Sequence, residues 1–481
     1  MSERHPRIAS LRTPDALRER LAELGVPLPC DDAVAAAPDS PLAEPLDLGA
    51  GPHGALQAAN RFVIQPMEGW DGTEDGRPTE LTERRWKNFG RSGAGWVWGG
   101  EAVAVRREGR ANPGQLVIDE QTAPALAALR ETLVAAAREA GGPEPVVGLQ
   151  LTHSGRWSRP EGPQAPRIAY RHPLLDRRVG VSDATPVLSD EELDGLVADF
   201  ARAARLSRDA GFSFVDVKHC HGYLLHEFLS ARTRSGRYGG ERLEDRCALT
   251  AAILAAVREA APDLRVGVRL SVFDQVPHAP GADGRGEPEL HARPYRFGFG
   301  LDPDEPARID LAESVAFVRS LATLGVDWVN VTASSPYYAP HLQRPALFPP
   351  SDGYLPPEDP LVGVARLLGA ARDLKRAVPE AVIVSSGWTY LQEYLPHVAQ
   401  ACVREGWFDA VGLGRMVLSY PELPADALAG RTLVRKKVCR TFSDCTTAPR
   451  NGLVSGCYPL DPFYRARPER KTLDALKRDE P

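Results

Sequence analysis

The chain has 481 residues, of which 43 % are hydrophobic and 25 % are charged, and its formal net charge is −6 at pH 7. This composition is ordinary for a globular protein, and the lack of a basic excess excludes nucleic acid as an expected partner. The N-terminal sequence has no apolar signal-peptide core, no apolar run could span a membrane, and seven cysteines suit a reducing cytoplasm better than a disulfide scaffold.

Short apolar runs rich in β-branched residues alternate along the chain with helical patterns. The first helical pattern covers Thr13–Gly25, and an Ala- and Pro-rich stretch follows it. Eight of the apolar runs are predicted to be strands, and in chain order they are Arg61–Pro66, Gly95–Gly99, Val146–Leu151, Phe212–Val217, Arg265–Ser271, Asp327–Thr332, Ala381–Ser385 and Asp409–Leu413.

The clearest helix start lies at Ser189. The Ser189 side chain can accept from an early helical N–H while Glu192 reaches back to the cap, which is a capping box. Leu188 and Leu193 have the spacing of a hydrophobic staple, and Gly211 suits the end of the helix. The sequence therefore predicts an amphipathic helix directly before the fourth strand.

Apolar strands that are each followed by a helix indicate a parallel sheet covered by helices. Eight such units favour closure into an α/β (β/α)8 TIM barrel, which we predict over residues 41–430 after an N-terminal extension, residues 1–40. The segment Gln275–Pro306 is rich in Gly, Pro, His and Arg and is predicted to be a long loop. Residues 431–481 form a Cys-containing C-terminal tail, expected to pack at first and then to be mobile.

In such a barrel the active site lies at the carboxyl ends of the strands. Gly387 follows the seventh predicted strand, and Gly414 with Arg415 follows the eighth. Glycine lets backbone N–H groups approach an anion, and arginine adds a bidentate contact, so these positions predict a phosphate site. The ends of the other strands carry further polar side chains, among them Gln65, Glu68, Glu101, Gln150, His153, Lys218, His221, Tyr223 and Arg269.

Five motifs carry a resemblance to a known family. They are Asn60–Met67 (NRFVIQPM), Gln150–Arg156 (QLTHSGR), His221–Ser230 (HGYLLHEFLS), Tyr238–Gly240 followed by Arg246, and Gly412–Arg415 (GLGR). In this order and at these intervals, the chain resembles the Old Yellow Enzyme (NADH:flavin oxidoreductase) family. Its layout is most similar to the barrel domain of the branch that includes dienoyl-CoA reductase and trimethylamine dehydrogenase.

The resemblance implies that FMN lies across the barrel mouth and is reduced by NADH or NADPH. The reduced flavin would then transfer hydride to an activated alkene such as an enone. Gln150 matches the side chain that binds the pyrimidine edge. Arg269 matches the cation near N1 and O2, where reduced flavin gathers negative charge. The other positions that match flavin contacts are Pro66, Met67, Glu68 and Ala102 around the ring, and Gly387, Gly414 and Arg415 at the phosphate.

The fourth strand is where the family binds substrate. Lys218 and His221 match the pair that hydrogen-bonds a carbonyl or phenolate oxygen, and Tyr223 matches the proton donor. The family usually has His with His or Asn in the pair, so Lys218 is a departure. Lys218 could instead form a Schiff base with a carbonyl, or pair with a carboxylate such as Glu101 and only hold its loop.

A second departure is Glu68, where the family often has Thr or Cys near flavin O4 and N5. A bare carboxylate there would disfavour an anionic reduced flavin, because like charges repel. Glu68 is therefore expected either to pair with Lys218 or to face away.

A third departure concerns iron. The cluster-binding branch uses four cysteines, whereas this chain has three in the corresponding segment, Cys439, Cys445 and Cys457. The second cysteine is missing and the first interval is one residue short, so we expect ordinary buried thiols, no iron–sulfur cluster and no bound metal.

Three alternatives stay open. A flavoprotein of this kind could run oxidatively, as a dehydrogenase, desaturase or amine oxidoreductase. A lysine Schiff-base aldolase would use Lys218, although it would have no need of a flavin site. A scaffold without catalysis would bind flavin only. The expected partner is a small molecule, with no nucleic acid and no membrane, and self-association into a homo-oligomer stays open.

Overall fold

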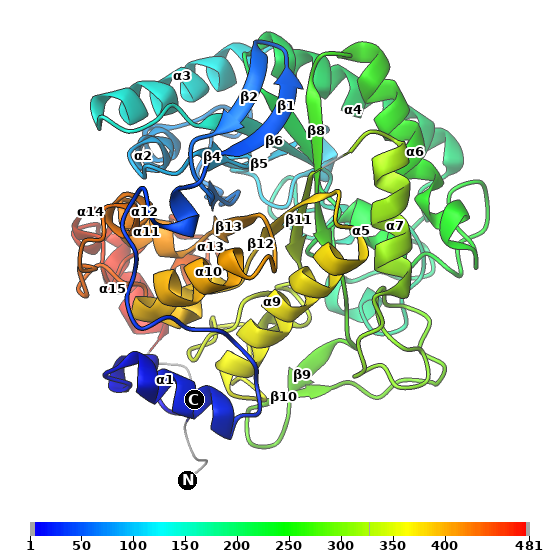
Figure 1. The fold of residues 1–481 in the computed structure, drawn as a ribbon. Coiled ribbons are helices and arrows are strands. Elements are labelled where there is room, and N and C mark those ends of the chain that lie inside the picture. Colours follow the sequence, from blue (N-terminus) through cyan, green and yellow to red (C-terminus); the bar gives the residue numbers. More distant parts are fainter. Residues whose placement is uncertain (1–4, 327, 478–481) are drawn as a thin grey trace.

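Eight parallel strands form a closed barrel in the computed structural model, which describes residues 5–326 and 328–477 (Figure 1). Neighbouring strands pair in the order β4-β3-β13-β12-β11-β8-β7-β6, and a pairing of β4 with β6 closes the ring. The predicted α/β (β/α)8 TIM barrel is therefore confirmed. Its strands are β3 (Phe62–Ile64), β4 (Trp96–Val97), β6 (Val146–Thr152), β7 (Phe214–Val217), β8 (Arg265–Ser271), β11 (Trp328–Thr332), β12 (Val382–Ser385) and β13 (Ala410–Leu413).

Each predicted strand overlaps one barrel strand, and only Asp327 of the predicted sixth strand lies outside the described residues. The second strand is the least regular. It stops after β4 and resumes as β5 (Ala102–Ala104), which pairs with β6 nearer the mouth of the barrel. Gly100 between them has φ +53°, a conformation that favours glycine and lets the chain bend there.

Helices surround the barrel on its outer face (Figure 1). The predicted capping box is confirmed: Glu192 N–H donates to Ser189 Oγ at 3.1 Å, and Ser189 N–H donates to Glu192 Oε2 at 2.8 Å. The helices are α1 (Pro14–Glu23), α2 (Glu80–Gly90), α3 (Ala123–Glu139), α4 (Asp190–Asp209), α5 (Leu224–Leu229), α6 (Leu243–Ala260), α7 (Ala312–Thr323), α8 (Pro340–Gln343), α9 (Pro360–Ala377), α10 (Leu395–Arg404), α11 (Met416–Ser419) and α12 (Leu423–Leu428).

The amino end of the barrel is filled with apolar side chains. The antiparallel hairpin β1 (Leu46–Gly51) and β2 (Gly54–Ala58) packs Leu48 and Leu56 against a buried aromatic cluster. The sequence analysis did not predict this hairpin. Because this end is filled, a ligand site is expected at the carboxyl ends of the strands. Interacting rings in the cluster have centroids 4.9 to 5.8 Å apart, and the residues are Trp96, Trp98, Phe214 and Trp328.

Two segments contain secondary structure that the sequence analysis did not assign. The expected loop Gln275–Pro306 contains the hairpin β9 (His278–Pro280) and β10 (Gly286–Pro288). The tail forms α13 (Asp444–Arg450), α14 (Pro462–Arg465) and α15 (Glu469–Leu476), with a small apolar core of its own. No helix among residues 5–326 and 328–477 is both long and apolar enough to cross a membrane.

Candidate active site

A cavity opens at the carboxyl ends of the strands, and nearly all of the predicted site residues line it. Ala102 is the exception: it is buried in β5, in register with Gln150, behind the cavity wall. The lining also includes residues that the sequence analysis missed, several of them from the tail. The predicted residues that line the cavity are Pro66, Met67, Glu68, Gln150, Lys218, His221, Tyr223, Arg269, Gly387, Gly414 and Arg415.

Gln150 and Arg269 are fixed by a buried carboxylate beneath them. Gln150 Nε2 donates to Asp216 Oδ2 at 2.5 Å, and the Arg269 backbone N–H donates to Asp216 Oδ1 at 2.7 Å. Burial raises the pKa of Asp216 to about 6 and lowers the pKa of the Arg269 guanidinium. Asp216 was missed, although a carboxylate inside an apolar strand is itself an unusual pattern. Asp216 therefore orients the Gln150 amide and holds the Arg269 backbone.

Glu68 lies at the centre of the substrate side. Its Oε1 is 2.7 Å from Lys218 Nζ, and its Oε2 accepts from Tyr223 Oη at 3.1 Å. The Trp70 indole N–H donates to the same Oε2 at 2.9 Å. Lys218 Nζ also lies 3.9 Å from the centroid of the Tyr223 ring. The Glu68 carboxylate therefore links Tyr223, the predicted proton donor, to Lys218, which is predicted to bind the substrate oxygen.

The proposed loop-holding contact between Lys218 and Glu101 does not form. Glu101 pairs instead with Arg85, whose Nε donates to Glu101 Oε1 at 2.9 Å, and it also accepts from the Gly69 backbone N–H at 3.1 Å. Of the two arrangements expected for Glu68, the pairing with Lys218 is the one that occurs. The positive charge of Lys218 is thus balanced by the Glu68 carboxylate at the cavity wall.

Tyr223 keeps its proton in this environment. Burial, and then the nearby Glu68 carboxylate, raise the pKa of Tyr223 well above its ordinary value of 10. Its hydroxyl is also 3.2 Å from that of Tyr337, whose ring stacks on Trp157 at 4.4 Å between centroids. A phenol held this way can donate a proton to a substrate at neutral pH.

His221 is held by its backbone in a left-handed conformation, with φ +66°. Ser271 Oγ accepts from its N–H at 3.2 Å, and Ser335 Oγ donates to its carbonyl at 2.7 Å. Burial, and then the charges of Arg269 and Lys218, lower the pKa of His221 well below 6.5, so the ring is neutral. A neutral imidazole can donate one N–H to a substrate oxygen.

Cationic side chains line the part of the cavity next to the carboxyl ends of β12 and β13. Gly387, after β12, has φ +98°, and Arg415 follows β13 with a buried Nη1 that has no hydrogen-bond partner in the described part of the chain. Arg344, at the end of α8, was missed and also lines this end. The predicted phosphate positions therefore converge with one additional arginine.

The three tail cysteines lie close to one another. Cys445 and Cys457 line the cavity, whereas Cys439 does not, and its backbone N–H donates to Met416 Sδ. Burial raises the pKa of Cys439 to about 11 and raises that of Cys457 further. Within residues 5–326 and 328–477, no group of three or more His, Cys, Asp or Glu side chains could hold a metal ion.

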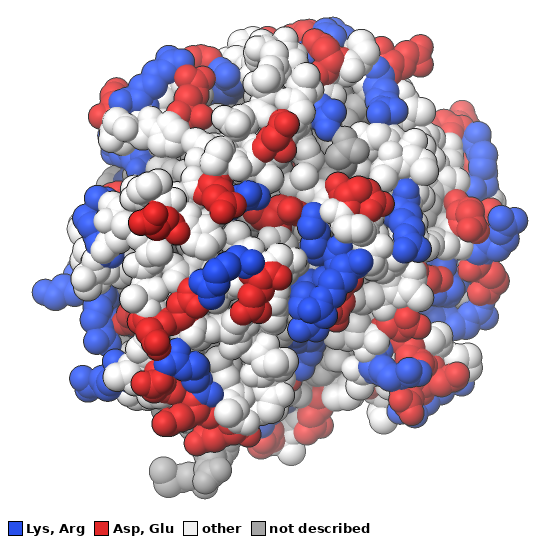
Figure 2. Space-filling model, in the orientation of Figure 1, with Lys and Arg blue, Asp and Glu red and all other residues white. Residues whose placement is uncertain are grey.

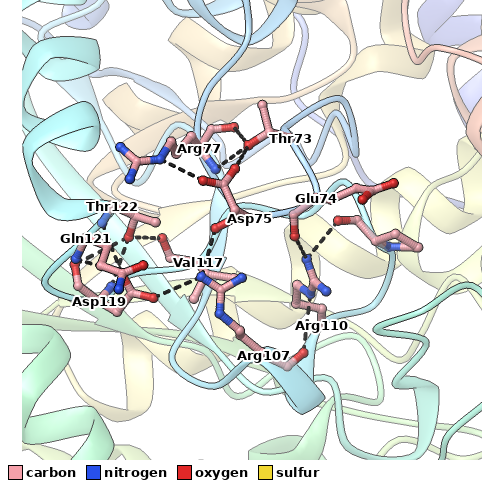
Figure 3. Close-up of polar contacts among 11 residues, drawn as sticks. Thr73, Glu74, Asp75, Arg77, Arg107, Arg110, Val117, Asp119, Gln121 and Thr122 are labelled. Carbon is pink, nitrogen blue, oxygen red and sulfur yellow. Dashed lines mark hydrogen bonds and ion pairs between the residues drawn. The ribbon is translucent and has the colours of Figure 1, made fainter.

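The loop that carries Glu68 is tied down at its far end (Figure 3). Beyond β5, Arg107 donates to the carbonyl of Asp75 at 3.0 Å, and Arg110 donates to that of Glu74 at 2.8 Å. Within the loop, the Arg77 N–H donates to Thr73 Oγ1 at 2.9 Å. Next to Glu68 itself, the Met67 N–H donates to the carbonyl of Gly100 at 2.8 Å and the Gly69 N–H donates to Glu101 Oε2, so the loop is held at both ends.

Comparisons with known proteins identify the family and the fold of the chain. A model of the NADH:flavin oxidoreductase / NADH oxidase family matches residues 41–283. A metal reductase of Desulforamulus reducens is 28 % identical over 382 residues, which are 78 % of this chain and 48 % of that protein. An NADPH dehydrogenase of Listeria welshimeri is 34 % identical over 225 residues, 45 % of this chain and 60 % of that protein. The chain thus spans about half the length of the first of these relatives.

Among solved structures, a 2-naphthoyl-CoA reductase in complex with 2-naphthoyl-CoA superposes with a TM-score of 0.64. The sequence identity is 18 %, and the match covers 90 % of this chain and 57 % of that one. At this identity the likeness establishes the shared fold.

Proposed function

The chain belongs to the NADH:flavin oxidoreductase / NADH oxidase family, and from this we propose that it is an FMN-dependent oxidoreductase acting on activated alkenes. NADH or NADPH would reduce the flavin, and an enone is the class of substrate that we propose. The observation that carries the proposal is the cluster of Lys218, His221 and Tyr223 on the wall of the cavity that holds the flavin-binding positions. The expected partner is a small molecule. On the face of the molecule shown in Figure 2, positive and negative side chains are interspersed.

The cavity residues fit FMN. Arg269 Nε and Arg415 Nη1 are buried and lack hydrogen-bond partners among the described residues, so each has an N–H group free to donate to a ligand. Arg415 with Gly387 and Gly414 would hold the phosphate, while Gln150 and Arg269 would hold the pyrimidine edge. Pro66 and Met67 would line the ring with their backbone. When bound, FMN supplies the hydride chemistry that the side chains alone lack.

The side chains account for the remaining steps. The Lys218 ammonium and the neutral His221 ring would donate hydrogen bonds to the carbonyl oxygen of an enone, and these strengthen as negative charge develops there. Tyr223 would give its proton to the α-carbon. The phenolate left behind lies beside Lys218, whose Nζ is 3.9 Å from the ring centroid. The pair with Glu68 argues against a Schiff base, because that ammonium must lose its proton before it can attack a carbonyl.

The test is anaerobic consumption of NADH and NADPH with a panel of enones. We expect one saturated product for each nicotinamide oxidised, and no consumption when the alkene is replaced by its saturated ketone. A flavin that is reduced by amines or alcohols, and is never reoxidised by any enone, would favour the oxidative alternative.

The rate of the step with substrate should depend little on pH between about pH 7 and about pH 9.5. The lowered pKa of His221 keeps its ring neutral throughout, and the raised pKa of Tyr223 keeps its phenol protonated as the pH rises. Stopped-flow reoxidation of pre-reduced protein measures this rate directly. A decline centred at or below pH 10, the range of an ordinary tyrosine, that is absent from Tyr223→Phe would show that Tyr223 ionises normally.

Iron should be absent from the purified protein. Three cysteines, Cys439, Cys445 and Cys457, provide one thiolate fewer than an iron–sulfur cluster ordinarily requires. The measurement is iron and acid-labile sulfide in anaerobically purified protein. Near-stoichiometric amounts of both would contradict the expectation and require a fourth ligand other than cysteine.

A further inference from the structure

The cationic side chains around the cavity differ in whether a carboxylate balances them. In the part of the chain that the structure describes, Arg269, Arg344 and Arg415 have no carboxylate within ion-pair distance. Arg269 already has a place beside the flavin ring, which leaves two arginines at the other end. The balanced pairs are Arg84 with Asp461, Arg85 with Asp71 and Glu101, Lys218 with Glu68, and Arg450 with Asp352.

Arg344 is buried and only half satisfied. Its side chain extends from the end of α8, and one guanidinium nitrogen, Nη1, donates to Thr446 Oγ1 in α13. The other, Nη2, is buried without a hydrogen-bond partner among the described residues. Burial, followed by the charges of Arg415 and Arg450, lowers the pKa of Arg344 to about 9. A buried Arg344 beside a partly exposed Arg415, each with a buried and unused N–H group, is unfavourable unless an anion lies close to both.

We propose that Arg344 is a second cationic ligand of the FMN phosphate, alongside Arg415, and that Thr446 positions its guanidinium. This inference rests on the proposed function. A phosphate monoester carries a charge of about −1.5 to −2 at pH 7, so Arg415 alone would leave part of it unbalanced. Arg344 supplies the second positive charge and a free N–H edge of the kind that binds phosphate oxygens. The tail would then be part of the cofactor site, through Thr446.

The test compares two flavins that differ only in the phosphate. Apoprotein of the parent and of Arg344→Met is titrated with FMN and with riboflavin, and binding is followed by quenching of flavin fluorescence. We expect Arg344→Met to weaken FMN binding roughly ten- to hundredfold, the effect of a lost charge-assisted contact. Riboflavin binding should change by less than about twofold, because it lacks the group that Arg344 would contact.

Two further variants separate local contact from general charge. Thr446→Val should weaken FMN binding about threefold to tenfold and leave riboflavin binding unchanged, because it releases the guanidinium without removing it. Arg12→Met removes one positive charge from an exposed position outside the cavity lining, and both affinities should stay at the parent values.

The stability of the apoprotein gives a readout that does not depend on flavin. Arg344→Met removes a buried cation that lacks a full set of partners, so the apoprotein should resist denaturant at least as well as the parent. A large loss of apoprotein stability would show that Arg344 serves the fold rather than the phosphate, and would overturn the proposal.

Equal weakening of FMN and riboflavin binding, or no change in either, would also overturn the proposal. These results differ from failure of the proposed function, in which the parent apoprotein would bind neither flavin.

Discussion

Replacing Tyr223 by phenylalanine is expected to slow the reaction of reduced flavin with substrate by about 10²–10⁴, the usual cost of removing a general acid. The reason is positional. The Tyr223 hydroxyl lies on the cavity wall, keeps its proton because its pKa is raised, and sits 3.1 Å from Glu68 Oε2. Reduction of the flavin by NADH or NADPH does not need this proton, so its rate should stay within about twofold of the parent.

Stopped flow separates the two half-reactions of Tyr223→Phe. Tyr337→Phe is the matched control, since it removes a neighbouring, partly buried phenol 3.2 Å away that has no assigned proton transfer. The control should lose less than about tenfold in the step with substrate. If Tyr223→Phe reacted with substrate as fast as the parent, Tyr223 would be a packing residue.

Lys218→Met should have the second large effect, on both stability and ligand binding. It leaves the Glu68 carboxylate without its cation at a site where the Lys218 side chain is 2 % exposed and that of Glu68 is 17 % exposed. Breaking such a pair should lower the free energy of unfolding by about 3 kcal/mol, at the lower end of the usual range because Glu68 retains some solvent contact. Phenolic ligands, which mimic the enolate, should also bind more weakly.

The double variant Lys218→Met/Glu68→Gln distinguishes the two effects. Removing both charges should restore most of the stability, because no unpaired carboxylate remains, but should not restore binding of the phenolic ligand. Denaturant unfolding and titration of the flavin absorbance with a phenol measure the two quantities. If Lys218→Met lost neither stability nor ligand affinity, the ion pair would have neither role.

The barrel strands could be predicted because each is buried on both faces and therefore appears as a short apolar run between helical patterns. The capping box at Ser189 was visible for a local reason, since both of its hydrogen bonds lie within four residues. The hairpin β1–β2 was not predicted. Only alternate residues such as Leu48 and Leu56 are buried, and what they cover is the amino end of the barrel, formed by strands distant in sequence.

The candidate site likewise contains residues that could be predicted from the sequence and residues that could not. Residues that follow a strand, such as Lys218 and Arg415, could be placed from strand order alone, because all eight strand ends meet at one mouth. Arg344 could not, since it lies in a proline-rich segment without periodicity and contacts Thr446, 102 positions away. The sequence offers two carboxylates, Glu68 and Glu101, as the ion-pair partner of Lys218. Only the three-dimensional arrangement shows that the partner is Glu68.

The central claim is that the cavity at the barrel mouth binds FMN, and the most direct measurement is the visible absorption spectrum of the purified protein with its flavin content. The protein should be yellow, with one FMN per chain released by heat, or should take up one FMN per chain when apoprotein is titrated. A colourless protein whose spectrum and fluorescence show no binding of added FMN would contradict the claim.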